Sequence, residues 1–125
     1  MQPTLLALAI ALVLLPATTL AADGPLVTGA DQTDKYVPQL KGKRVGMVVN
    51  PTSIIGDRPS VDVLLESGVK VVKIFGPEHG FRGNASNGTA VADEVDAKTG
   101  VPIISLYGKK RKPSAADMSG LDVLI

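Results

Sequence analysis

The 125-residue sequence has no cysteine, no tryptophan and a single histidine. Without cysteine there are no disulfide bonds, thiolate metal ligands or thiol nucleophiles, so stability must come from side-chain packing. Two Phe and two Tyr are too few to stack the bases of a single-stranded nucleic acid. A formal net charge of +1 lacks the basic excess of nucleic-acid-binding proteins. We therefore expect no nucleic-acid partner.

Residues 1–22 contain no charged side chain. The apolar run Leu5–Leu15 is broken by Pro16 and followed by small residues up to Ala22, which is the layout of a secretory signal peptide. The run is shorter than the roughly 20 residues of a membrane-spanning helix. Met1–Thr4 has no Lys or Arg, so a short anchor that stays attached is the alternative. We expect export to the periplasm or beyond, with no membrane contact after cleavage.

Residues 23–41 form a polar lead-in segment, in which Tyr36–Leu40 is predicted to be a short helix or turn. The regular part of the chain, residues 42–125, begins with the largely apolar, β-branched run Arg44–Val49. This run ends at the turn signal Asn50-Pro51. The pattern predicts a strand that is buried on both faces, as strands of parallel sheets are.

The next two predicted elements complete a strand–helix–strand unit. Apolar residues recur at the spacing of one helical face over residues 61–67, with Ser60 as the N-cap and Gly68 just past the helix end. Val69–Phe75 is a second apolar, β-branched run. Because two parallel strands need such a crossover, we predict that both strands lie parallel in an α/β fold.

The pattern repeats in the second half of the chain. Gly100–Tyr107 is predicted as a third strand, and Ser114 with Asp117 forms a capping box for a short helix that ends at Gly120. Leu121–Ile125 begins a fourth apolar strand. A half-built central strand would leave a hydrophobic edge unpaired, so we expect the chain to be part of a longer protein.

The carboxyl ends of the predicted strands are the expected ligand-binding edge, since open parallel sheets bind ligands there. The loops that reach this edge are 50–58, 76–94 and 108–113. The second loop holds the sequence GPEHGFRG, with Glu78, His79 and Arg82. Glu78 is a possible general acid, because burial would raise its pKa, although pairing with Arg82 would oppose that shift. A solvated glycine-rich turn with a structural histidine is the alternative.

Other kinds of site find little support. There is no Gly-x-Gly-x-x-Gly after the first strand, no phosphate-binding Gly-Lys-Ser/Thr loop and no Gly-x-Ser-x-Gly elbow. Glu78 and His79 are adjacent and would point apart on a strand, which disfavours a metal site. The basic run Lys109–Lys112 is either a solvated loop or an attractor for an anionic substrate, with Arg111 best suited to a bidentate carboxylate contact.

These segments together resemble the bacterial exo-β-N-acetylmuramidases. The resemblance covers about residues 41–125 and is most specific in GPEHGFRG. The segments that carry it are Arg44-Val45-Gly46, Asn50-Pro51-Thr52, Val61–Leu65, Phe75–Gly83, Thr99–Pro102 and Ser105–Gly108 with Arg111-Lys112-Pro113.

The resemblance implies a glycosidase that removes N-acetylmuramic acid from the non-reducing ends of peptidoglycan fragments. It implies a Rossmann-like N-terminal domain, a second domain with the cleft between them, and no metal or organic cofactor. Glu78 matches the glutamate considered catalytic in this family, and Asn50, His79 and Arg82 fall in motifs that line the cleft. Family members continue beyond the segment present here into a second domain, so this chain would carry at most half of the cleft, without any partner group supplied from downstream.

The residues agree with glycoside hydrolysis, which needs one group to protonate the leaving oxygen and another at the anomeric carbon. We predict Glu78 as the general acid/base, with Arg82 or Arg111 binding the lactyl carboxylate of the muramyl group. The alternative is an exported protein that binds a sugar or muropeptide without hydrolysing it. Nothing in the sequence indicates the oligomeric state.

Overall fold

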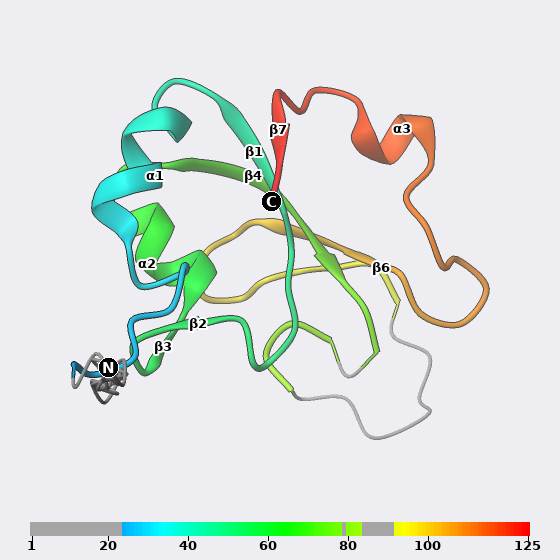
Figure 1. Cartoon of the computed structure of the whole chain (residues 1–125). Helices are drawn as coiled ribbons and strands as arrows, with labels where there is room; N and C mark the ends of the chain where they lie inside the picture. The colour runs from blue at the N-terminus through cyan, green and yellow to red at the C-terminus, as the bar shows by residue number, and fades with distance from the viewer. Residues whose placement is uncertain (1–23, 79, 84–91) are drawn as a thin grey trace, which may run out of the picture.

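A computed structural model describes residues 24–78, 80–83 and 92–125 of the chain. The predicted signal peptide at residues 1–22 and His79 lie outside the described residues. The secondary-structure elements, shown in Figure 1, are α1 (Thr33–Leu40), β1 (Arg44–Val48), β2 (Ile54–Ile55), β3 (Arg58–Pro59), α2 (Ser60–Glu66), β4 (Lys70–Gly76), β5 (Glu94–Val95), β6 (Pro102–Ser105), α3 (Ala115–Met118) and β7 (Val123–Leu124).

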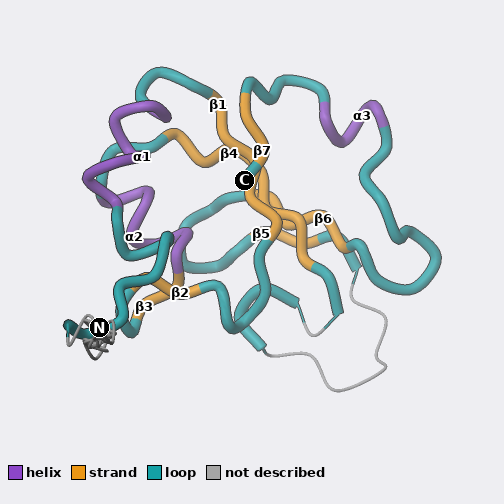
Figure 2. The backbone as a smooth tube through the Cα atoms, in the orientation of Figure 1, coloured by secondary structure: helices purple, strands orange, loops and turns teal. Residues whose placement is uncertain are grey.

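The main sheet has five strands in the order β5-β6-β4-β1-β7. β1, β4, β6 and β7 pair in parallel, which confirms the predicted α/β fold with parallel strands. The short edge strand β5 is antiparallel to β6, so the sheet is mixed rather than purely parallel as predicted. β2 and β3 form a separate hairpin in the loop after β1 (Figure 2).

The helices flank the sheet on two sides. α1 and α2 lie together against one side, and α3 lies apart from them beside β7 (Figures 1 and 2). The completely buried core includes Val45, Leu64 and Ile74. Gly46 allows close packing on β1, because an added Cβ would lie 2.7 Å from Leu121 Cδ1 and 3.2 Å from Phe75 Cε2. A larger residue would overfill this layer.

The predicted N-cap of α2 is wrong by one residue. Pro59 is the N-cap and Ser60 is the first helical residue, because β3 extends the backbone through Pro59, which has φ −52° and ψ 129°. The Ser60 hydroxyl is buried and has no hydrogen-bond partner among the described residues. At the other end, Gly68 has φ 81° and its amide donates to the Leu65 carbonyl, which confirms its predicted place just past the helix.

The short helices α1 and α3 both lie close to their predicted positions. α1 begins three residues before the predicted segment, at Thr33. α3 has the predicted capping box: the Asp117 amide donates to Ser114 Oγ, and the Ser114 amide donates to the Asp117 carboxylate at 2.8 Å. In the parts of the chain that the structure describes, no helix is long and apolar enough to cross a membrane.

Candidate active site

The carboxyl edges of β4 and β6 bring Glu78 and Tyr107 together. Gly76 pairs with Ser105 in the sheet, and the Leu106 amide donates to the Gly76 carbonyl at 2.8 Å. Glu78 therefore lies two residues after Gly76, and Tyr107 lies two residues after its paired residue Ser105. The Glu78 carboxylate, as hydrogen-bond acceptor and as a negative charge, raises the pKa of the Tyr107 phenol. The phenol thus keeps its proton at neutral pH.

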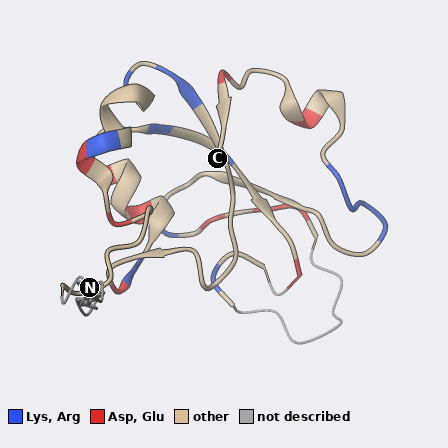
Figure 3. Ribbon diagram, in the orientation of Figure 1, with Lys and Arg blue, Asp and Glu red and all other residues tan. Residues whose placement is uncertain are grey.

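Arg111 belongs to the same group. Its positive charge acts on the Tyr107 phenol in the opposite direction to Glu78, lowering the pKa of that group. Arg111 is exposed on the loop between β6 and α3, within the basic run drawn in blue in Figure 3. Its neighbour Lys110 lies 3.5 Å from carboxylate oxygens of both Asp93 and Asp117. Glu78, Tyr107 and Arg111 thus all lie on the two loops that leave the carboxyl edges of β4 and β6.

Glu78 sits in a tight turn. The Gly80 amide donates to the Pro77 carbonyl at 3.1 Å, and Gly80 has φ 68°, a conformation that glycine adopts without strain. Phe81, which follows, is buried in the core at 3% exposure. The turn therefore presents an exposed Glu78 while its next residues anchor it to the protein.

Arg82, which is partly buried, forms an ionic cluster with two buried carboxylates. Its Nε donates to Asp96 Oδ1 at 2.6 Å, and its Nη2 donates both to Asp96 Oδ2 at 2.7 Å and to Asp62 Oδ1 at 2.9 Å. Lys98 Nζ donates to Asp62 Oδ2 at 2.6 Å. The Arg82 guanidinium lowers the pKa of the Asp96 carboxyl to about 2 and also lowers that of Asp62. Both carboxylates are therefore ionised at neutral pH.

These contacts bear on the predicted role of Arg82. Its guanidinium is already engaged by two carboxylates, so its main interactions in the described structure are internal. Contact with a substrate stays a prediction for this residue. Of the two arginines considered for the muramyl carboxylate, Arg111 is the exposed one.

Asn50 shapes the loop after β1. Its side-chain oxygen accepts hydrogen bonds from the Thr52 amide at 3.0 Å and the Thr52 hydroxyl at 2.8 Å, which is an Asx turn. Pro51 in this turn lies close to Gly83, since a Cβ added to that glycine would lie 3.2 Å from Pro51 Cγ. The predicted substrate contact of Asn50 stays a prediction.

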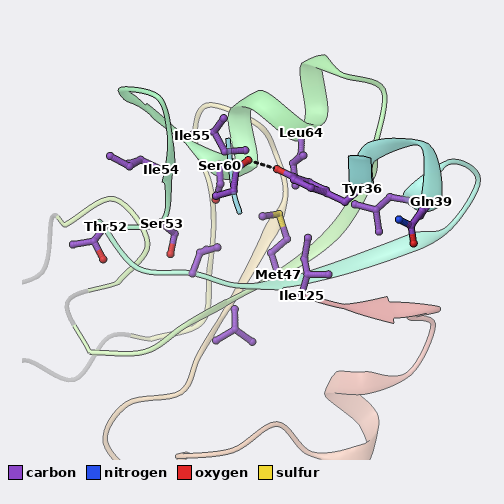
Figure 4. A pocket seen from close by; sticks show the side chains of 14 residues that line it. Tyr36, Gln39, Met47, Thr52, Ser53, Ile54, Ile55, Ser60, Leu64 and Ile125 are labelled. Atoms are coloured by element: carbon purple, nitrogen blue, oxygen red, sulfur yellow. Dashed lines mark hydrogen bonds between the residues drawn. The ribbon is translucent and has the colours of Figure 1, made fainter. Parts of the chain in front are cut away.

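A separate cavity of about 600 Å³ opens between α1, α2 and the β2–β3 hairpin. Figure 4 shows its mostly apolar lining, including Met47, Ile54, Leu64 and Ile125, and the hydrogen bond from the Tyr36 hydroxyl to the Ala30 carbonyl at 2.7 Å. The lining residues include no charged side chain. The lining includes no carboxylate, and the Tyr36 hydroxyl already donates to the Ala30 carbonyl, so the cavity is a poorer candidate for acid–base catalysis than the edge that carries Glu78.

No group of three or more His, Asp or Glu side chains with metal-binding potential occurs within residues 24–78, 80–83 and 92–125.

Sequence reasoning missed three residues of this region. Tyr107 was predicted only as the end of a strand, although its place after β6 matches that of Glu78 after β4. Asp62 was read as part of a helix, and its burial at 3% exposure follows from its pairing with Arg82 and Lys98. Asp96 precedes the third strand by several residues, and its partner Arg82 is distant in sequence.

Comparison with known proteins identifies the family. The family model described as "Exo-beta-N-acetylmuramidase NamZ, N-terminal" matches residues 45–125. The chain belongs to this family. A NamZ protein of Bacillus subtilis, the peptidoglycan beta-N-acetylmuramidase, is 46% identical over 92 residues, which are 72% of this chain and 22% of that protein. The resemblance predicted from the sequence is therefore confirmed.

Solved structures agree with the NamZ family assignment. A DUF1343 family protein of Bacteroides fragilis is 47% identical with a TM-score of 0.61, over 77% of this chain and 23% of that one. A second DUF1343 protein of the same organism is 38% identical with a TM-score of 0.67, over 78% of this chain and 24% of that one. This chain thus spans less than a quarter of the length of these NamZ relatives.

Proposed function

We propose that this chain contributes Glu78 and its surroundings to a glycosidase that removes N-acetylmuramic acid from the non-reducing ends of peptidoglycan fragments. The observation that carries the proposal is the placement of Glu78 and Tyr107 at equivalent positions just after the paired ends of β4 and β6, at the carboxyl edge of a parallel sheet, in a chain that matches the NamZ family. This edge is where open α/β sheets bind their ligands.

In the proposed reaction, Glu78 acts as the general acid/base. As the acid, it donates its proton to the glycosidic oxygen while the bond to the anomeric carbon breaks. The Tyr107 phenol, which stays protonated, orients the Glu78 carboxylate that results. A second group must stabilise or attack the anomeric carbon, and the relatives are long enough to supply it from elsewhere in the protein.

Arg111 gives a basis for choosing muramyl sugars. The lactyl ether of N-acetylmuramic acid carries a carboxylate, which distinguishes this sugar from N-acetylglucosamine. Arg111 is an exposed guanidinium on the loop that follows Tyr107, and guanidinium groups bind carboxylates through two parallel hydrogen bonds. We therefore assign the lactyl carboxylate to the Arg111 side of the site.

The test is release of chromophore from a chromogenic β-N-acetylmuramide by the full-length protein and its Glu78→Gln variant. The variant should lose a factor of about 10² to 10⁴ in kcat, the usual contribution of a general acid or base. Glu66→Gln is the matched control, because Glu66 is an exposed carboxylate on α2 that pairs with Arg58. Near-normal release by Glu78→Gln would refute the role of Glu78, and no release by the unmodified protein would favour a binding function instead.

Export is a separate proposal, supported by the uncharged, apolar composition of residues 1–22. Mass spectrometry of the protein recovered outside the cytoplasm should find a new N-terminus near Ala22. An intact Met1 in the membrane fraction would favour a retained anchor.

A further inference from the structure

The Arg82 cluster joins three separate parts of the chain beside the proposed catalytic turn. Asp62 lies on α2, Arg82 follows the Glu78 turn, and Asp96 follows the edge strand β5. Asp96 is fixed in turn by Thr99, whose amide donates to Asp96 Oδ2 at 3.1 Å and whose hydroxyl donates to the same oxygen at 2.5 Å. The guanidinium is thus held from two directions by carboxylates on different elements.

Stability alone does not explain this cluster well. The side chains of Asp62 and Asp96 are only 2% and 4% exposed, so folding removes both charges from water. This desolvation opposes the gain from pairing, and apolar side chains of similar volume often stabilise a protein as much or more. What a half-buried guanidinium with several hydrogen bonds to buried carboxylates does provide is a fixed position for its own segment of chain.

That segment carries Glu78. Only the turn closed by the Gly80 amide and the buried Phe81 separate Glu78 from Arg82. The Arg82 guanidinium carbon also lies 4.4 Å from the centre of the Phe81 ring, so the two anchors support each other. On the other side of Glu78, β4 is fixed in the sheet through Gly76.

We propose that Arg82, held by Asp62 and Asp96, is a positioning residue that fixes the backbone at Gly80–Gly83, just after Glu78, so that Glu78 is directed toward Tyr107. This inference rests on the proposed function for its effect on catalysis, but its effect on the turn is independent of it. Glu78 is exposed, so its direction depends on the backbone that carries it. A shift of about 1 Å at a catalytic group can reduce the rate about 10²-fold.

The chain offers a matched control for the ionic chemistry. Arg44 and Asp122 form another bidentate pair, with Nε–Oδ2 and NH2–Oδ1 distances of 3.0 and 2.8 Å. This pair lies at the start of β1, at the opposite end of the strand from the carboxyl edge, and is partly exposed. Arg44→Lys therefore removes the same kind of contact away from Glu78.

The experiment compares Arg82→Lys, Asp96→Asn and Arg44→Lys in the full-length protein. The first readout is amide hydrogen exchange of a peptide that contains residues 77–83, which requires no activity. We expect exchange there to increase about tenfold or more in Arg82→Lys and Asp96→Asn, and to stay unchanged in Arg44→Lys. The second readout is kcat on a β-N-acetylmuramide, which should fall about tenfold or more in the first two variants while KM changes less than about threefold.

The outcomes separate the two proposals. If the unmodified protein releases no muramic acid, the proposed function fails, and exchange alone decides the positioning role. If exchange over residues 77–83 is unchanged in Arg82→Lys and Asp96→Asn, the positioning role is wrong. The positioning role is also wrong if neither variant folds. It is wrong, too, if both variants lose global stability while their folded fraction keeps the kcat of the unmodified protein. In either case the cluster would serve the fold as a whole rather than the position of Glu78.

Discussion

The Leu106 amide donates a hydrogen bond to the Gly76 carbonyl at 2.8 Å, at the point where β4 and β6 end side by side. This bond sets the register of the two chain segments that leave the sheet. Two residues after Gly76 comes Glu78, and the equivalent position after Ser105 is Tyr107. The pairing of these two side chains is therefore a consequence of strand register, which motivates the first prediction.

Tyr107→Phe should reduce kcat about 10- to 100-fold without preventing folding. The substitution removes the hydroxyl that faces Glu78 and keeps the ring. Tyr36→Phe is the matched control: it removes a hydroxyl that donates to the Ala30 carbonyl beside the apolar cavity. That variant should lose about 1 kcal/mol of stability and keep its kcat. Steady-state kinetics measures kcat and denaturant titration measures stability for each variant. If Tyr107→Phe and Tyr36→Phe changed kcat equally, the role of the Tyr107 hydroxyl beside Glu78 would be wrong.

Arg111→Met should raise KM for β-N-acetylmuramides about tenfold and leave KM for the corresponding N-acetylglucosaminide unchanged. Only the muramyl sugar carries the lactyl carboxylate that Arg111 is proposed to bind. Lys112→Met removes one positive charge from the same basic run and serves as the control. If both variants raise KM equally, the run acts as a general electrostatic attractor, and the specific assignment to Arg111 is wrong.

Asp96 should make the protein's stability depend on acid pH. Its pKa in the folded protein is about 2, below the usual range of an aspartate, because Arg82 donates hydrogen bonds to its ionised form. A lowered folded pKa means that the stabilisation is complete well above pH 4 and is lost as the pH falls through about 2. The difference in unfolding free energy between the unmodified protein and Asp96→Asn should therefore be largest well above pH 4 and should shrink as the pH falls toward 2.

Denaturant titration at a series of pH values measures that difference directly. Asp122→Asn is a useful comparison, because Arg44 also lowers the pKa of the Asp122 carboxyl. A difference for Asp96→Asn that is constant from pH 7 to pH 2 would show that ionisation of Asp96 does not stabilise the fold.

Local patterns predicted most of the fold, because the signals that specify it are local. The apolar run at β1, the helical spacing within α2 and the capping box at Ser114 each lie within a few residues, and each was confirmed. β5 was missed since its two residues carry no alternating pattern and depend on pairing with β6. Ser60 was misplaced because Pro59 also fits the end of an extended segment.

The candidate site was predictable only in part. GPEHGFRG is a local motif, so Glu78 and Arg82 could be singled out, and Arg111 stood out by charge. Tyr107 could not be singled out from the sequence, because its position relative to Glu78 arises from the register of β4 and β6. The partners of Arg82 come from distant segments, so the sequence indicated a cation near a substrate where the structure shows one engaged by Asp62 and Asp96.

The contact between Gly83 and Pro51 has a consequence for transplanting this site. Gly83 has φ 72°, and a Cβ there would lie 3.2 Å from Pro51 Cγ, so the loop after β4 runs close beside the loop after β1. Copying the eight-residue motif into another parallel sheet would carry over Glu78 without the surface against which its loop rests. A working graft would need both loops together, which makes the pair of loops the transferable unit.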